Sequence, residues 1–220
     1  MIKTPLVSFR FVAYVILLLA LLPSTAQPDN LAWRIIADND DILVHKAATP
    51  NSAIHTYRGT TIIQLAATQP LITILNDFGN YPRWFHYISE AKELQRINAS
   101  ESYLRLRMLV PWPAKNREAV LHTTLQHTPA TAKQPEQLTY HFKLAQEHPV
   151  ETPTYRQFKH FEGVIHAQLR EDNQALLSYQ IHADPGGRIR PRLSNHMLKS
   201  APYFTLDKLR ILLQSPIYKQ

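Results

Sequence analysis

The sequence has no cysteine, only 5 glycines in 220 residues, and no motif of a familiar enzyme class. The absence of cysteine excludes disulfides, thiolate metal sites and a cysteine nucleophile. No phosphate-cradling glycine loop, dinucleotide fingerprint or Gly-x-Ser-x-Gly motif is present. With 45% hydrophobic and 19% charged residues, the composition excludes collagen, coiled coil and extended disorder, and it indicates one globular domain.

The first 26 residues have the pattern of a secretory signal peptide. Lys3 and Arg10 precede an uncharged apolar run over residues 11–22, and the small residues Ser24 and Ala26 predict cleavage after position 26. An uncleaved anchor is the weaker alternative, because the run has 12 residues and a spanning helix needs about 20. We therefore expect a domain over residues 27–220 in the periplasm or outside the cell.

The charge balance is mildly basic, with a formal net charge of +7. A basic excess attracts nucleic acid or anionic lipid head groups. Because an exported chain rarely meets nucleic acid, transient contact with a membrane surface is the better hypothesis and no nucleic-acid partner is expected. Solubilising charge scattered over the surface of a monomer is the alternative that stays open.

Hydrophobic periodicity predicts an α+β domain. Residues 41–46 and 53–66 are expected to form a hairpin, followed by a helix that begins after Thr68 and stops at Gly79, and by a second short helix or turn over residues 80–89. A final helix over residues 193–213 should be kinked or divided at Pro202. Between these helices, period-two alternation predicts an antiparallel meander with strands at residues 91–97, 103–110, 116–126, 137–145, 155–169 and 174–183.

This layout requires cover for one face of a long sheet, and the helices are the only apolar cover available. A curved sheet wrapped around the last helix satisfies the requirement. Such an arrangement commonly leaves an apolar cavity for a small ligand between the two layers. A solid core is the alternative.

The turn between two of the predicted strands carries Val-Pro-Trp-Pro-Ala-Lys-Asn-Arg-Glu over residues 110–118. It resembles a turn of StAR-related lipid-transfer (START) domains, which is proline-rich, often contains tryptophan, and is followed by arginine and an acidic residue. Glu118 stands where aspartate is common. Further similar pieces follow the family's order over nearly all of residues 31–214: Trp33, residues 41–44, residues 80–84, residues 191–195, Ala201-Pro202 and Leu209-Arg210.

The resemblance implies a helix-grip fold, in which a curved antiparallel sheet wraps around a long C-terminal helix and two short helices follow the second strand. It implies a carrier that encloses one lipid or similar hydrophobic molecule, with the terminal helix and adjacent loops as a lid. It also implies no catalysis and no cofactor. Arg117 would then meet the polar head group or hydroxyl of the ligand.

Alternation along its strand places Arg117 on the inward face. A buried guanidinium is costly unless it is hydrogen-bonded or paired, so Arg117 either binds a ligand or forms a structural ion pair. Glu101 is not expected to be its partner, because it faces outward. The other candidates for the ligand site, each of which is also a candidate for plain core, are Leu104, Leu106, Met108, Leu121, Leu125, Tyr140, Phe142, Phe161, Ile165, Leu177, Tyr179, Ile181, Met197 and Ala201.

Among these candidates, Tyr140 and Tyr179 stand out because an inward phenol needs a hydrogen-bond partner, which a ligand oxygen could supply. The 11 histidines do not indicate a metal site. His160, Glu162 and His166 share a strand face with other polar residues, and no His-Glu-x-x-His pair exists. We expect no metal.

Three hypotheses follow. The favoured one is a non-enzymatic protein that binds and transfers a lipid in the cell envelope. The second is an enzyme on the same fold, such as an aromatic-polyketide cyclase or a hydrolase of a hydrophobic substrate, in which an inward arginine and tyrosine act as electrophile and general acid. The third is an envelope interaction protein with a filled core.

Overall fold

The computed structural model describes residues 31–112, 114–148 and 153–218, and residues 31–220 group as one unit. The predicted signal peptide, residues 1–26, lies outside the described residues. The helical elements are α1 (Gln69–Asn76), the 3-10 turn η1 (Phe78–Asn80), α2 (Tyr81–Trp84) and α3 (Pro191–Leu213). The strands are β1 (Arg34–Asn39), β2 (Ile42–Ala47), β3 (Thr56–Gln64), β4 (Ile88–Asn98), β5 (Glu101–Met108), β6 (Arg117–Thr128), β7 (Gln137–Leu144), β8 (Arg156–Gln157), β9 (His160–Leu169) and β10 (Gln174–Asp184).

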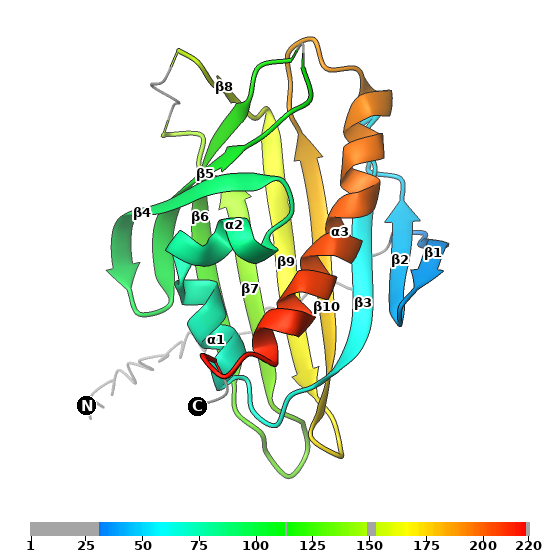
Figure 1. The fold of residues 1–220 in the computed structure, drawn as a ribbon, viewed down its shortest axis with the longest axis vertical. Helices are drawn as coiled ribbons and strands as arrows, with labels where there is room; N and C mark the ends of the chain where they lie inside the picture. The colour runs from blue at the N-terminus through cyan, green and yellow to red at the C-terminus, as the bar shows by residue number, and fades with distance from the viewer. Residues whose placement is uncertain (1–30, 113, 149–152, 219–220) are drawn as a thin grey trace, which may run out of the picture. The chain divides into compact units, whose positions relative to one another are not determined.

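The strands form one sheet in the order β1-β2-β3-β10-β9-β7-β6-β5-β4, and the short β8 lies beside β6. Every pairing along this order is antiparallel, whereas β8 pairs with β6 in parallel. The connection through α1, η1 and α2 leads from β3 to β4 at the far edge of the sheet. The helices lie on one side of the sheet, with α3 across β3 and β10 (Figure 1). This arrangement confirms the predicted helix-grip fold.

The second half of α3 packs directly on β3 at Gly59. A Cβ atom added to Gly59 would lie 2.7 Å from Leu206 Cδ1 and 2.9 Å from Pro202 Cβ, which is closer than such atoms pack, so only glycine allows this approach. The sequence predicted that Pro202 kinks or divides the final helix. It does not divide it, because α3 is a single helix with Pro202 inside it. Burial of Pro202 against β3 compensates for the hydrogen bond that proline cannot donate.

The start of the sheet differs from the prediction, because three strands rather than two precede the short helices. The unpredicted strand is β1, which pairs with β2 through a turn at Asp40 and Asp41. Both residues have positive φ, 50° and 62°, as a tight hairpin turn of the primed type requires. The turn contains no glycine, which is the usual signal of such a hairpin. The predicted strand over residues 155–169 is divided into β8 and β9.

Thr68 occupies the N-cap position of α1 as predicted, but its side chain does not cap the helix. Its hydroxyl donates instead to Glu136 Oε1, and its backbone N–H donates to the same oxygen at 3.1 Å. The contact joins the start of α1 to the loop before β7. No helix in the described part of the chain is long and apolar enough to span a membrane.

Candidate ligand-binding site

An apolar cavity of about 30 Å³ lies between the first turns of α3 and the sheet. It can hold no more than a couple of water molecules, whereas pockets for small ligands measure about 300–1,000 Å³. The hollow expected from the sequence is therefore present but much smaller than a lipid. Its lining residues are Met108, Val110, Phe158, Ala183, Pro185, Ile189, Ser194, Met197 and Leu198.

Ser194 supplies a hydroxyl to this otherwise apolar lining. The side chain is 3% exposed, and its Oγ has no hydrogen-bond partner among the described residues. A buried hydroxyl without a partner costs about 1–3 kcal/mol. The cavity thus contains a hydrogen-bonding group that the described protein does not satisfy.

A basic basin of about 840 Å³ adjoins the cavity, with Ile189 as a shared wall. It opens at the end of the sheet where the β5–β6 loop and the start of α3 meet (Figure 1). None of its described lining residues is a carboxylate. We call this surface the basic basin; its lining residues are Pro111, Ala114, Lys115, Arg117, Arg156, Gly187, Arg188, Ile189, Arg190 and Leu193.

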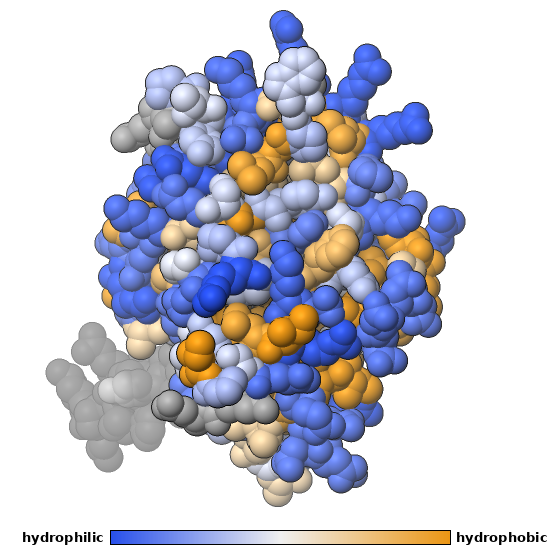
Figure 2. Space-filling model, in the orientation of Figure 1, coloured by the Kyte–Doolittle hydropathy of each residue, from blue (hydrophilic) through white to orange (hydrophobic). Residues whose placement is uncertain are grey.

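Apolar side chains are exposed beside the basic basin. Trp112 is 92% exposed and Leu109 54%, and both belong to the β5–β6 loop. Figure 2 shows hydrophobic side chains, in orange, among hydrophilic ones, in blue, at this end of α3. The combination of exposed apolar and cationic groups suits a surface that meets a lipid head-group layer.

Arg117 points inward, as predicted, and is 2% exposed. Its Nε donates to the carbonyl of Pro185 at 2.6 Å, its Nη2 donates to that of Gly186 at 3.0 Å, and its Nη1 donates to that of Lys115. Burial, followed by repulsion from Arg156, lowers the pKa of Arg117. Of the two alternatives left open by the sequence, the structural ion pair is not formed: backbone carbonyls take its place, and Arg117 holds the β10–α3 loop against the start of β6.

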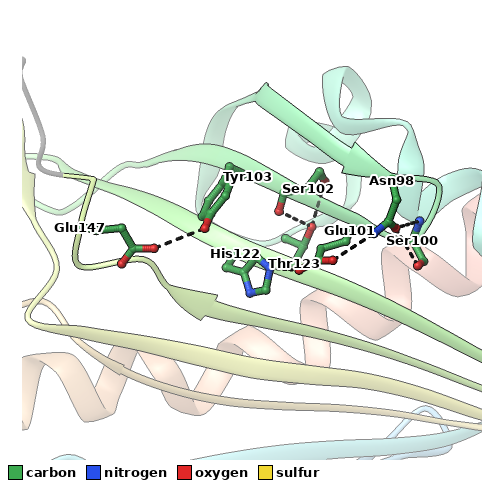
Figure 3. Close-up of polar contacts among 8 residues, drawn as sticks. All are labelled: Asn98, Ser100, Glu101, Ser102, Tyr103, His122, Thr123 and Glu147. Atoms are coloured by element: carbon green, nitrogen blue, oxygen red, sulfur yellow. Dashed lines mark hydrogen bonds and ion pairs between the residues drawn. The ribbon is translucent and has the colours of Figure 1, made fainter.

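Glu101 does not approach Arg117, as predicted. Its carboxylate lies 2.6 Å from His122 Nε2 on the outer face of the sheet, whereas Ser102 and Thr123 face inward and share a hydrogen bond of 3.0 Å (Figure 3). Glu118, next to Arg117 in the chain, also points away from the interior. It pairs at 2.8 Å with Arg107.

The sequence-predicted ligand residues are divided between the cavity and the packed core. Met108 and Met197 line the cavity, and Arg117 lines the basic basin. Ala201 is buried on α3, and Leu125 is half-buried against the core. The remaining candidates lie in the core without bordering the cavity: Leu104, Leu106, Leu121, Tyr140, Phe142, Phe161, Ile165, Leu177, Tyr179 and Ile181.

The two inward phenols differ in their hydrogen bonding. The Tyr81 hydroxyl donates to the Leu75 carbonyl at 2.6 Å, and the Tyr140 hydroxyl lies within hydrogen-bond distance of the same Tyr81 oxygen, at 3.1 Å. The Tyr179 hydroxyl is fully buried and has no partner among the described residues. Burial raises the pKa of Tyr140 to about 12 and that of Tyr179 well above its usual value, so both stay protonated at neutral pH.

Asn195, in the first half of α3, binds the loop between β2 and β3. The Asn195 side chain accepts from the backbone N–H of His55 at 2.8 Å and donates to the carbonyl of Ala53 at 3.0 Å. Met197, in the same half of α3, lines the small cavity, whereas Leu206 in the second half packs directly over Gly59. Sequence reasoning missed Asn195, because its partners lie some 140 positions away in the chain.

Sequence reasoning also missed the other arginines of the basic basin, Arg156, Arg188 and Arg190. The alternation of arginine with other residues over positions 188–192 was the available signal. No group of three or more metal-ligating side chains occurs among the residues that the structure describes. His160 and Glu162 pair with each other at 3.2 Å on the outer face of the sheet.

Comparisons with known proteins identify the fold. No family model matches the chain. An uncharacterized protein of Pseudomonas aeruginosa is 25% identical over 178 residues, 81% of this chain and 85% of that protein. The crystal structure of a STAR-related lipid transfer protein from Xanthomonas axonopodis superposes with a TM-score of 0.73 at 22% identity, covering 83% of this chain and 99% of that one. Human STARD10 superposes with a TM-score of 0.71 at 14% identity, covering 86% and 76%.

The described residues therefore form a START-like domain with the helix-grip fold. The resemblance stated from the sequence is confirmed at the level of the fold.

Proposed function

We propose that this protein binds one hydrophobic small molecule, such as a lipid, between α3 and the sheet and carries it within the cell envelope. The observation that carries the proposal is the apolar cavity beneath the first half of α3, with its unpartnered Ser194 hydroxyl. Burial of the ligand's hydrocarbon would supply affinity at about 25 cal/mol per Å² of apolar surface.

Uptake requires the first half of α3 to move, because the cavity has room for about 30 Å³. Pro202 is a suitable pivot, since its nitrogen cannot donate the helical hydrogen bond that would join it to the preceding turn. The second half stays anchored by Leu206 on Gly59. The described structure is then the closed form of a lid.

Two further features support a carrier in the envelope. The predicted signal peptide favours export, and the similar protein from Xanthomonas axonopodis is named a lipid transfer protein. We propose that the domain acts without catalysis, since none of the described residues that line the cavity or the basic basin is a histidine or a carboxylate. The small cavity favours, as a second candidate, an interaction protein with a filled core.

A lipid-uptake assay tests the proposal. The purified protein is titrated with fluorescent single-chain, two-chain and sterol probes, and bound probe is separated from free probe by gel filtration. We expect saturation at one molecule per chain for at least one probe class, with loss of binding after urea unfolding. Failure of every probe class to bind saturably would support the filled-core candidate.

A further inference from the structure

The cationic side chains of the basic basin lack anionic partners within the protein. Arg156, Arg188 and Arg190 are exposed, and none forms an ion pair with a carboxylate of the described residues. The Arg117 guanidinium is engaged by three backbone carbonyls, which would lose their hydrogen-bond donor if it turned to a ligand. The basin therefore concentrates positive charge that a bound anion would neutralise.

The start of α3 adds to this field. The helix has 23 residues, no acidic residue in its first turn and no side-chain cap, so its macrodipole places partial positive charge at this end. Ser194 belongs to this first turn and carries the buried hydroxyl without a partner. Its neighbour Leu193 lines the basic basin, whereas Ser194 lines the cavity.

The basin and the cavity thus meet at Leu193, Ser194 and Ile189, with cationic groups on the outer side and apolar ones on the inner side. A neutral lipid would leave the arginines unpaired, and a free inorganic anion would leave the cavity unfilled. The arrangement matches a molecule with one anionic end and one hydrocarbon end.

We infer that the ligand of this protein is an anionic amphiphile, whose carboxylate or phosphate binds in the basic basin and whose hydrocarbon chain enters beneath the first half of α3. This inference rests on the proposed function, because it specifies the ligand of the same site. Arg156 and Arg188 hold the head group, and Ser194 donates a hydrogen bond where the head joins the chain. A fatty acid and an alkyl phosphate share this chemistry.

The test compares two fluorescent probes with the same chain, pyrene-dodecanoic acid and pyrene-dodecanol. For the wild-type protein, the acid should bind at least tenfold more tightly than the alcohol at low salt, and raising the salt should weaken the acid alone. The double variant Arg156→Gln/Arg188→Gln should lose at least tenfold in affinity for the acid and less than twofold for the alcohol. Ser194→Ala should weaken the acid by about fivefold, the loss of one hydrogen bond.

A matched control removes two exposed arginines that do not line the basin, Arg34→Gln/Arg170→Gln. It changes the net charge equally and should alter neither affinity, and both double variants should keep the wild-type urea midpoint. Competition by dodecanoic acid and by dodecyl phosphate, below their micellar concentrations, then decides between the two head groups.

The possible failures can be told apart. Equal affinities for acid and alcohol in wild type and variants would overturn the anionic ligand and leave the carrier standing. Binding of neither probe, in any form, would count against the carrier as well. Binding of the protein to anionic vesicles, with no affinity for the monomeric acid, would assign the basic basin to a membrane surface and also overturn the inference.

Discussion

Replacing Arg117 with alanine is expected to lower the free energy of unfolding by about 3–4 kcal/mol. The guanidinium donates to three backbone carbonyls, those of Lys115, Pro185 and Gly186. Each bond from a charged donor contributes about 1.5–3 kcal/mol, and the cost of burying the charge offsets part of the sum. The loss is measured by urea unfolding. Binding of acidic and neutral ligands should weaken together, because the β10–α3 loop would no longer be held in place.

Two further variants serve as comparisons for Arg117→Ala. Arg117→Lys should recover little of the stability, since one ammonium group cannot reach three carbonyls in a fork. Arg105→Ala removes a partly exposed pair with Glu90, 2.7 Å long, and should cost less than about 1 kcal/mol. A loss below about 1 kcal/mol for Arg117→Ala would show that the three carbonyls do not depend on the guanidinium.

Cross-linking the first half of α3 to the loop that leads into β3 is expected to stop ligand exchange. The pair His55→Cys/Asn195→Cys replaces residues that are joined by a hydrogen bond of 2.8 Å. Once the disulfide has formed, the lid cannot open, and exchange should slow by at least roughly tenfold because opening limits it. Stopped-flow displacement of a fluorescent probe measures the rate, and intact mass confirms the cross-link.

Because the wild-type chain has no cysteine, it cannot form a disulfide and serves as the control for the oxidant and the reductant. Oxidant and reductant should leave the wild-type exchange rate unchanged. After reduction, the double variant should exchange at least as fast as wild type, because it also lacks the hydrogen bonds of Asn195 to His55 and Ala53. Unchanged exchange in the verified disulfide form would show that the ligand does not pass beneath this half of α3.

The sheet could be predicted from the sequence because its signal is local. In β5, Ser102, Leu104, Leu106 and Met108 are buried and the residues between them are half-buried, so the period of two is directly visible. β1 was missed because its turn uses two aspartates with positive φ in place of glycine. A kink or a division was predicted at Pro202 because the residue against which it packs, Gly59 in β3, lies far away in the chain.

For the candidate site, the sequence predicts which face of its strand a side chain lies on, but not which groups that side chain contacts. The alternation along β6 correctly placed Arg117 inward. Two of its three acceptors, however, are carbonyls of a loop almost 70 positions later, and no side-chain pattern encodes carbonyls. Tyr140 is similar: its partner is Tyr81, on a helix whose place on the sheet depends on the whole fold. The size of the cavity depends on how side chains fill space, which a pattern of polar and apolar residues does not determine.

Native mass spectrometry of the intact protein, purified without detergent and then incubated with a lipid extract, tests the central claim most directly. We expect a complex with one bound hydrophobic molecule per chain, and we expect the bound molecules to be enriched in anionic amphiphiles. The complex should disappear when the protein is unfolded. A protein that stays empty in every preparation, with the mass of the chain alone, would contradict the claim that its interior opens to a ligand.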